Sequence, residues 1–288
     1  MNYKLIFSDE ELVKQVEEFE KCDFISVDFE GEFNLHIYGE HLCLIQVFDG
    51  QNYYIVDPRS PKITTLGLKC LFDSKVMKLW FDCQSDLALV RKAYDLDITN
   101  IFDIRVLAQL VEDNGNLTHL ISKYLNIESE EGNNKKKNQQ ANWLIRPLSP
   151  TLIEYALGDV KYLHLLKPIL EEEVEKAGKT SEIKFFMKKA SERHAVKPPY
   201  TKLANWKKLS KNQKIYLKNF YLARDVVAKR FNQPAHYILD KHKMIDTALK
   251  TPETLEQAFI SFGNISPRFI NYLKESFAKA YTQIEKEK

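Results

Sequence analysis

The order of apolar patterns along this 288-residue chain predicts an α/β domain, a mixed sheet flanked by helices, followed by an all-α helical bundle. Strand-like runs come early, and strands and helices alternate after them. Consecutive prolines then stop a long helical pattern that runs from about Asp159, and only helical patterns follow them. The length favours two domains, because one hydrophobic core rarely serves a chain of this size.

Four strand-like segments form the predicted sheet. The apolar run Phe24 to Val27 leads into the first strand, and Leu42 to Phe48 and Tyr53 to Val56 form the second and third. Asp49-Gly50 is a turn signal, so the second and third strands should be antiparallel. The fourth strand, Val76 to Phe81, precedes a helical pattern and indicates a parallel unit.

Helical patterns follow within the first domain. One begins at Asp86, directly after the fourth strand, and another covers residues 152 to 163. Asp103 stands where a short strand meets a helix, and we predict that it caps that helix and is not a ligand.

The proline pair lies in Val196 to Tyr200, so we place the first domain at residues 1–195 and the second at residues 200–288. The second domain should be a helical bundle, because apolar residues recur at helical spacing in four stretches separated by turn signals. These stretches are Ile215 to Val227, Met244 to Leu249, Leu255 to Phe262 and Ile270 to Tyr281.

Acidic residues occur in three separate segments at spacings that suit a shared site. Asp28 and Glu30 are two apart at the end of a strand, so they project from the same face. Tyr155 and Asp159 are four apart on a helix and share a face about one turn apart. Asp86 comes between a strand and a helix, which is where open sheets place their sites.

Each of these elements alone has a simpler interpretation. An Asp-x-Glu at a strand end is most often a solvated edge, and a tyrosine four residues before an aspartate is usually a core aromatic beside a surface charge. Asp82 is a rival to Asp86, and its own alternative is a capping or loop acid.

Taken together, the acids indicate a metal-dependent nuclease. Four carboxylates in one pocket repel each other and resist ionising unless cations share the site. Hard divalent ions prefer carboxylate oxygens, and two such ions about 4 Å apart can hold both the attacking and the leaving oxygen of a phosphodiester displacement.

The three segments resemble the three motifs of the DEDD superfamily of 3′-to-5′ exonucleases, in the variant with tyrosine in the third motif, and the overall pattern is most similar to the ribonuclease D family. The similarity runs over roughly residues 20 to 170 and implies a ribonuclease-H-like fold. Beyond the acids it includes Leu42-Cys43-Leu44-Ile45-Gln46 after the first motif and Asn142-Trp143-Leu144-Ile145-Arg146-Pro147-Leu148-Ser149 before the third.

The resemblance also implies a role for each residue. Asp28, Glu30 and Asp159 would bind one divalent ion, Mg²⁺ or Mn²⁺, while Asp28 and, mostly through water, Asp86 would hold a second. Tyr155 would position the attacking water. The enzyme would trim RNA 3′ ends, with transfer-RNA precursors as the substrate that the family suggests, and release nucleoside 5′-monophosphates. Two alternatives remain open, namely a 3′-5′ exonuclease on DNA and a catalytically inactive protein that binds nucleic acid.

The charge is divided unevenly along the chain. Residues 1 to 175 hold 18 basic and 30 acidic side chains, residues 176 to 230 hold 16 and 3, and the remainder hold 8 and 7. The basic segment suits phosphate contact, although a solvated lysine-rich face is the simpler alternative. Its aromatic residues could stack on bases but at helical spacing most of them should fill a core. They are Tyr200, Trp206, Tyr216, Phe220 and Tyr221.

The last 85 or so residues resemble the helicase-and-RNase-D C-terminal (HRDC) domain, a nucleic-acid-binding accessory module. Helical bundles share similar patterns, so the order of the two domains adds to this resemblance. The features that carry it are Ala223-Arg224, Pro234, Tyr237-Ile238-Leu239-Asp240, and Thr251-Pro252 followed by Leu255.

Composition predicts a cytoplasmic protein without a membrane partner. The beginning of the sequence turns acidic too soon for a signal peptide, and no apolar run approaches membrane length. The cysteines show no C-x-x-C spacing, so we expect free thiols in a reducing compartment and neither a zinc site nor disulfides. They are Cys22, Cys43, Cys70 and Cys83.

Two features depart from the family pattern. Phe29 stands between the first-motif acids, where many relatives carry a small polar residue, and we expect it to alter how a terminal nucleotide packs. The insert Glu128 to Ala141 is polar and includes Lys135-Lys136-Lys137. We expect a mobile loop there, either touching substrate phosphates or simply disordered.

Overall fold

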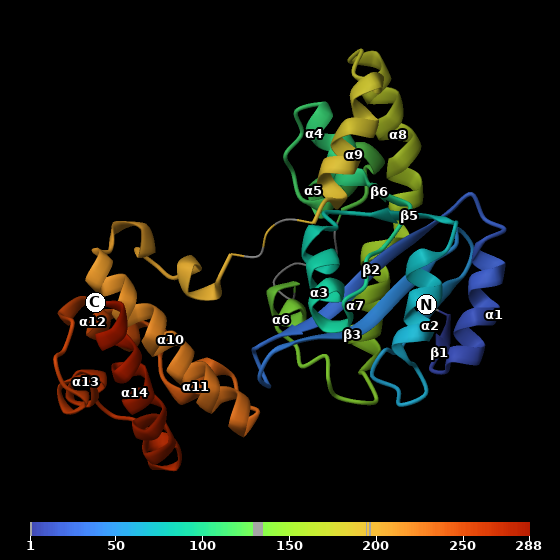
Figure 1. Cartoon of the computed structure of the whole chain (residues 1–288). Helices are drawn as coiled ribbons and strands as arrows, with labels where there is room; N and C mark the ends of the chain where they lie inside the picture. The colour runs from blue at the N-terminus through green and yellow to red at the C-terminus, as the bar shows by residue number, and fades with distance from the viewer. Residues whose placement is uncertain (1, 129–134, 194, 196) are drawn as a thin grey trace. The chain divides into compact units, whose positions relative to one another are not determined.

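The computed structural model describes residues 2–128, 135–193, 195 and 197–288. The chain forms two compact units, each with a hydrophobic core of its own (Figure 1). The first unit is α/β and comprises Met1–Glu32 and Glu40–Arg193. The second is helical and comprises Phe33–Gly39 and His194–Lys288. Within the described ranges, no helix is both long enough and apolar enough to cross a membrane.

The first unit is built on a mixed sheet, which the described residues form in the order β1-β4-β3-β2-β5-β6. β4 runs parallel to β1 and antiparallel to β3, while β5 runs parallel to both β2 and β6. The predicted mixed sheet and the hairpin at Asp49-Gly50 are confirmed. β1 was not foreseen, because only its last residue is buried and it therefore shows no alternation. The strands are β1 Tyr3–Ile6, β2 Phe24–Phe33, β3 Glu40–Phe48, β4 Tyr53–Val56, β5 Met77–Trp80 and β6 Ile101–Asp103.

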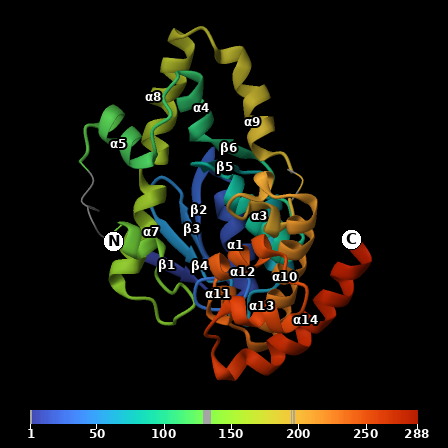
Figure 2. The same ribbon diagram turned by 90° about the vertical axis from the view of Figure 1, so that its left-hand side faces the viewer.

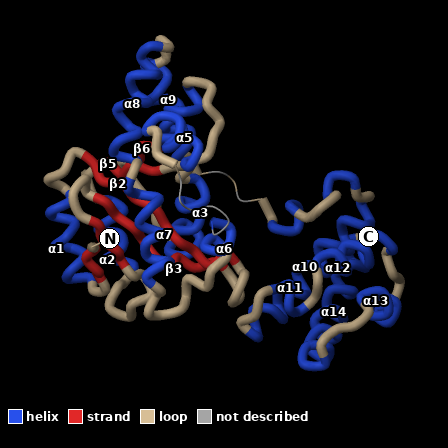
Figure 3. The backbone as a smooth tube through the Cα atoms, turned by 180° about the vertical axis from the view of Figure 1, so that it is seen from behind, coloured by secondary structure: helices blue, strands red, loops and turns tan. Residues whose placement is uncertain are grey.

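Helices cover both faces of this sheet, and the strands lie between them (Figures 2 and 3). Leu12 of α1, Leu71 of α2 and Val90 of α3 share one core with β2 and β3. α7 and α8 lie on the opposite side of the sheet (Figure 2). The helices of this unit are α1 Asp9–Phe19, α2 Thr65–Asp73, α3 Gln84–Tyr94, α4 Ile104–Leu110, α5 Leu117–Leu125, α6 Lys135–Gln139, α7 Pro150–Lys161, α8 Leu163–Lys176 and α9 Ile183–Ser191.

The second unit is the predicted helical region. Phe220 lies at the centre of its core, with ring centroids 5.6 Å from Phe262 and 5.2 Å from Phe277. Asn232 follows the end of α10, the helix that contains the predicted stretch Ile215 to Val227. Its φ of 48° is in the left-handed region, which asparagine tolerates. The helices are α10 Lys211–Phe231, α11 Ala235–Ile238, α12 Lys241–Lys250, α13 Leu255–Phe262 and α14 Pro267–Glu287, preceded by 3₁₀ turns η3 Pro199–Lys202 and η4 Trp206–Lys208.

Two expectations about the connecting segments need correction. The long helical pattern from about Asp159 is divided among α7, α8 and α9, and Gly178, with φ of 70°, follows the end of α8. In the insert, Lys135–Gln139 forms α6, so the expectation of a loop is wrong there, since lysine and glutamine favour helix. Glu128, Gln140 and Ala141 lie outside regular structure, whereas residues 129–134 of the same insert are outside the described residues, as is Val196 at the expected domain boundary.

Candidate active site

β2 presents two of the predicted ligands on one face of the sheet. Its odd positions from Ile25 to Phe29 are buried in the core beneath α1, α2 and α3. Side chains alternate along a strand, so Asp28 and Glu30 point to the other face. Ser26 supports this orientation, because its hydroxyl oxygen lies 2.6 Å from Nδ1 of His164 in α8.

Phe29 lies on the core face of β2 and not beside the carboxylates. Its ring centroid is 4.9 Å from that of Trp80 in an edge-on contact and 5.9 Å from that of Phe72. The expectation that Phe29 alters the packing of a terminal nucleotide is therefore wrong, because the side chain is buried inside the domain.

α7 carries Tyr155 and Asp159. Ser149 caps the helix by accepting a hydrogen bond, 3.3 Å long, from the backbone N–H at the third helical position. Ala156 and Leu157 hold the helix against the sheet, since both are fully buried in a core shared with β3. The helix therefore starts at a defined residue and rests on a defined strand, which fixes the direction of its polar side chains.

Three carboxylates meet between β2 and α7. One oxygen atom from each of Asp28, Glu30 and Asp159 lies within 4.8 Å of the other two, and all three side chains are half-buried. Tyr155, one turn before Asp159, is 8% exposed, and its ring centroid is 6.2 Å from that of Trp143. The structure thus brings three of the four predicted acids together, while their role as ligands remains a prediction.

Asp86 is not one of these three but belongs to the same electrostatic cluster. It lies in the first turn of α3, and Nε1–H of Trp80, at the end of β5, donates a hydrogen bond of 2.8 Å to its Oδ2. Trp80 is fully buried, so its indole holds the carboxylate in place. The negative charge of Asp86 raises the pKa of both Asp28 and Glu30.

Asp82 and Asp103, the two other aspartates near Asp86, make contacts that stabilise the fold. Asp103 caps α4, as predicted, by accepting a hydrogen bond of 2.9 Å from the N–H of Arg105. It also accepts hydrogen bonds from the backbone N–H groups of Asp82 and Cys83. Asp82 is exposed and forms an ion pair with Arg105 at 3.2 Å. Asp103 therefore fixes the turn that leads into α3 and, through it, the position of Asp86.

Burial and repulsion oppose ionisation of the clustered acids. Loss of hydration raises the pKa of Asp28 well above its usual range, and the charges of Asp86, Asp159 and Glu30 raise it further. Burial, then Asp159 and Asp86, also raise the pKa of Glu30 well above its usual range. Burial raises the pKa of Asp86 to about 7 despite the hydrogen bond from the indole.

A divalent cation fits this set of donors. In the described part of the chain, no lysine or arginine forms an ion pair with Asp28 or Glu30, so their charge has no protein counterion. Carboxylate oxygens are the ligands that Mg²⁺ and Mn²⁺ prefer, and the charge of the ion would offset the repulsion that raises the pKa values.

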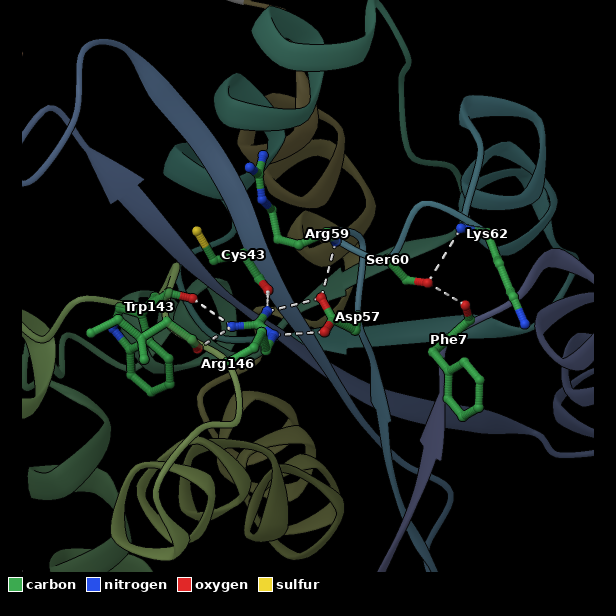
Figure 4. A network of polar contacts seen from close by, with 9 residues as sticks. Phe7, Cys43, Asp57, Arg59, Ser60, Lys62, Trp143 and Arg146 are labelled. Carbon is green, nitrogen blue, oxygen red and sulfur yellow. Dashed lines mark hydrogen bonds and ion pairs between the residues drawn. The ribbon is translucent and has the colours of Figure 1, made fainter. Parts of the chain in front are cut away.

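Arg146 joins the segment before α7 to the sheet (Figure 4). Its Nε and one terminal nitrogen donate to both carboxylate oxygens of Asp57, at 2.6 and 2.8 Å. The same nitrogen donates to the carbonyl of Cys43 in β3 at 2.6 Å, and the other terminal nitrogen donates to the carbonyls of Trp143 and Ile145. This fork fixes the peptide that carries Trp143, and thereby the entry into the helix that bears Tyr155.

Trp80, Arg146 and the pair Ser26 and His164 were not predicted to have a role at the site. Signals were present for two of them. Ser26 precedes Asp28 by two residues on a strand, so it had to share its face, and Arg146 lies within a segment that resembles the family. For Trp80 the sequence offered only its place at the end of an apolar run, which is typical of an ordinary core residue.

Comparison with known proteins places this geometry in context. Residues 3–175 match the 3′-5′ exonuclease family. Human exosome complex component 10 is 27% identical over 283 residues, which are 92% of this chain and 31% of that protein. Ribonuclease D of Haemophilus influenzae is 31% identical over 154 residues, 52% of this chain and 37% of that protein. The chain thus spans about a third of the length of these curated relatives.

Solved structures share the fold. Escherichia coli RNase D superposes with a TM-score of 0.74 at 21% identity, covering 100% of this chain and 75% of that chain. The catalytic core of RRP6 from Trypanosoma brucei gives a TM-score of 0.76 at 18% identity, covering 99% and 79%. Brucella melitensis NrnC with bound Mg²⁺ gives 0.52 at 21% identity, covering 66% of this chain and 88% of that chain.

The carboxylate cluster predicts a pH-dependent stabilisation by metal. Because their pKa values are raised, these acids hold protons in the metal-free folded protein that the unfolded chain releases. Their contribution to the free energy of unfolding is therefore fully present at low pH and is lost as pH rises. For Asp86 the loss extends from pH 3.8 to about 7. At a concentration about 100 times its Kd, Mg²⁺ or Mn²⁺ should raise the melting temperature by about 5–10 °C at pH 8. The rise should be smaller at pH 5.5.

The matched variants are Asp28→Asn and Glu10→Gln, the second an exposed acid in α1. Differential scanning fluorimetry with metal and with chelator should show the rise in Glu10→Gln and show little of it in Asp28→Asn. An equal rise in both variants would contradict the assignment of Asp28 as a ligand.

The contacts of Arg146 predict that its substitution lowers the free energy of unfolding strongly, and that substitution of its partner Asp57 lowers it only slightly. Arg146→Met removes all of its charge-assisted hydrogen bonds and should lower the free energy of unfolding by about 2–4 kcal/mol. Asp57→Asn keeps one acceptor and should cost about 1 kcal/mol. The control is Arg59→Met, whose exposed side chain points away from the network (Figure 4) and should change stability by less than about 0.5 kcal/mol. Urea denaturation measures all three, and similar losses for Arg146→Met and Arg59→Met would refute the role of the fork.

Proposed function

Because the chain belongs to the 3′-5′ exonuclease family, we propose that it is a divalent-metal-dependent 3′-5′ exoribonuclease of the ribonuclease D type. The observation that carries the proposal is the group of Asp28, Glu30 and Asp159, whose oxygens lie within 4.8 Å of one another. Asp86 adds a fourth negative charge, and Tyr155 lies one helical turn from Asp159. Such a site suits hydrolysis of a phosphodiester.

In this proposal Asp28, Glu30 and Asp159 hold one divalent ion, and Asp28 with Asp86 holds a second. Bound there, the ions would lower the pKa of the nucleophilic water and offset the charge on the 3′-oxygen leaving group. Tyr155 orients the water through its hydroxyl. A phenol with its ordinary pKa of about 10 keeps its proton at neutral pH. Tyr155 would therefore orient the water and would not act as a strong base.

The remaining side chains keep these groups in place. Trp80 fixes Asp86 through its indole N–H, and Asp103 fixes the turn before it. The contact between Ser26 and His164 joins β2 to α8. Ser26 lies two residues before Asp28, on the same face of the strand. Mg²⁺ and Mn²⁺ are the ions that we infer, because the donors are oxygen atoms only, and the binding of Mg²⁺ by NrnC supports this choice.

The substrate that we infer is the 3′ end of single-stranded RNA, from which the protein would release nucleoside 5′-monophosphates. The similarity to ribonuclease D, which in Escherichia coli is an exoribonuclease, supports RNA over DNA. Transfer-RNA precursors and a cytoplasmic location are the finer parts of this proposal, and the resemblance to ribonuclease D supports them.

We also propose that residues 200–288 form an HRDC-like domain that binds nucleic acid. The helical core of this region and its basic first part support the proposal. Tyr216 and Phe220 are buried in that core and are therefore not available for stacking on bases. Tyr237 in α11, 60% exposed, is free of that restriction.

A gel time course tests the proposed function. With Mg²⁺ or Mn²⁺, 5′-labelled single-stranded RNA should shorten step by step, 3′-labelled RNA should release only mononucleotide, and a chelator should stop both. Asp28→Asn and Asp86→Asn should each lower turnover by at least about 10²-fold, because both remove a ligand. Asp82→Asn, the exposed neighbour, should keep turnover within about threefold. Matched DNA ranks the two sugars, and binding without shortening under every metal would overturn the proposal.

Tyr155→Phe separates orientation from metal binding. The substitution removes only the hydroxyl, so kcat should fall by about 10²-fold while KM and the stabilisation by metal stay close to those of the wild type. Tyr162→Phe, at a half-exposed position just after α7, is the control and should leave kcat unchanged. An unaltered kcat in Tyr155→Phe would remove this residue from the mechanism.

A further inference from the structure

The outer face of α9 combines an exposed aromatic ring with three lysines. Ile183, Phe186 and Met187 turn inward and pack on the core formed with α4, α5 and α8. The opposite positions, Lys184, Phe185, Lys188 and Lys189, are exposed, and the Phe185 side chain is 65% exposed. Residues three and four apart on a helix are neighbours, so these four side chains form one continuous stripe.

The stripe carries the positive charge of three lysines. α9 contains no acidic residue between Ile183 and Ser191. Over the described ranges, none of the three lysines has an ion pair or a hydrogen bond from its ammonium group. Glu182 and Glu192 stand at the two ends of the helix. Phe185 packs edge-on against Phe186, with ring centroids 5.2 Å apart, so its exposed ring has a defined place among the lysines.

The inner face of α9 touches the turn that positions Asp86. Sδ of Met187 accepts a hydrogen bond of 3.2 Å from the backbone N–H of Asp103, and the Cys83 thiol lies 3.8 Å from the carbonyl of Ala190. Cys83 immediately precedes α3, whose first turn carries Asp86. The stripe therefore lies across the diameter of α9 from the turn that leads into α3.

We propose that the α9 stripe, Lys184, Phe185, Lys188 and Lys189, is a binding site for single-stranded RNA on the 5′ side of the nucleotide being removed. The inference rests on the proposed function, because it assigns the path of that substrate beyond the carboxylate cluster. Charge complementarity commits the surface to this occupant. The lysines neutralise backbone phosphates, and Phe185 provides a stacking platform for one base of any identity.

This mode of binding has two physical signatures. Each phosphate contact to a single strand contributes about 0.7 to the slope of log Kd against log salt, so loss of three lysines should reduce the slope by about 2. Loss of a stacked base should weaken binding by about 10-fold. A dinucleotide bound at the carboxylates has no further nucleotide on its 5′ side, so neither effect should reach its turnover.

The test is fluorescence anisotropy of the full chain with a labelled single-stranded RNA of about 16 nucleotides, in chelator so that no turnover occurs. The variants are Phe185→Ala, Phe185→Tyr and the triple change of Lys184, Lys188 and Lys189 to Gln. The control is the triple change of Lys14, Lys62 and Lys75 to Gln, which removes the same charge from exposed positions on and near α1 and α2.

The expected result is a Kd raised about 10-fold in Phe185→Ala and restored in Phe185→Tyr, with the salt slope reduced by about 2 in the α9 triple variant only. Melting temperatures and dinucleotide turnover should match those of the wild type. Equal Kd values for Phe185→Ala and the wild type, or equal slopes for the two triple variants, would overturn the inference. If the wild type binds RNA through this stripe but does not shorten it, the proposed exonuclease function is refuted and the RNA-binding role of the stripe is retained.

Discussion

Repulsion among half-buried carboxylates is the constraint on which the rest of the first unit depends. Asp28, Glu30 and Asp159 hold oxygens within 4.8 Å of one another, and burial together with neighbouring charge raises the pKa of Asp28 and Glu30. A flexible scaffold would relieve this strain by letting the side chains separate. Here β2 lies between two other strands of the sheet, and α7 rests on β3, so neither element can withdraw without losing core contacts.

Packing and chemistry are coupled through residues that serve both. β2 buries its odd positions and presents its acids on the other face, so the burial of Phe29 and the aim of Asp28 have the same cause. Trp80 fills the core with its rings and fixes Asp86 with its N–H. Arg146 acts on the opposite element, since it ties the peptide before α7 to β3 and to Asp57. The site is therefore rigid because its supports are parts of the core.

The sequence allowed prediction of whatever depends on local geometry. Alternation placed Asp28 and Glu30 on one face, helical spacing placed Tyr155 with Asp159, and turn chemistry located the hairpin. It did not reveal the Arg146 and Asp57 fork, which joins residues 89 positions apart, because that pairing depends on where β4 ends relative to a later loop. Phe29 was misjudged because it was interpreted from the family motif around it. The alternation of side chains along β2 already places it on the core face. The HRDC-like role of the second unit and the ligand roles of the acids remain predictions.

The most direct test of the central claim is a crystal structure of the protein grown with Mn²⁺, with anomalous diffraction measured at the manganese edge. The account predicts an anomalous peak in contact with carboxylate oxygens of Asp28, Glu30 and Asp159, and a second peak on the side of Asp28 that faces Asp86. The absence of any peak at these carboxylates, in crystals that bind Mn²⁺ elsewhere, would contradict the claim that the cluster is built for divalent cations.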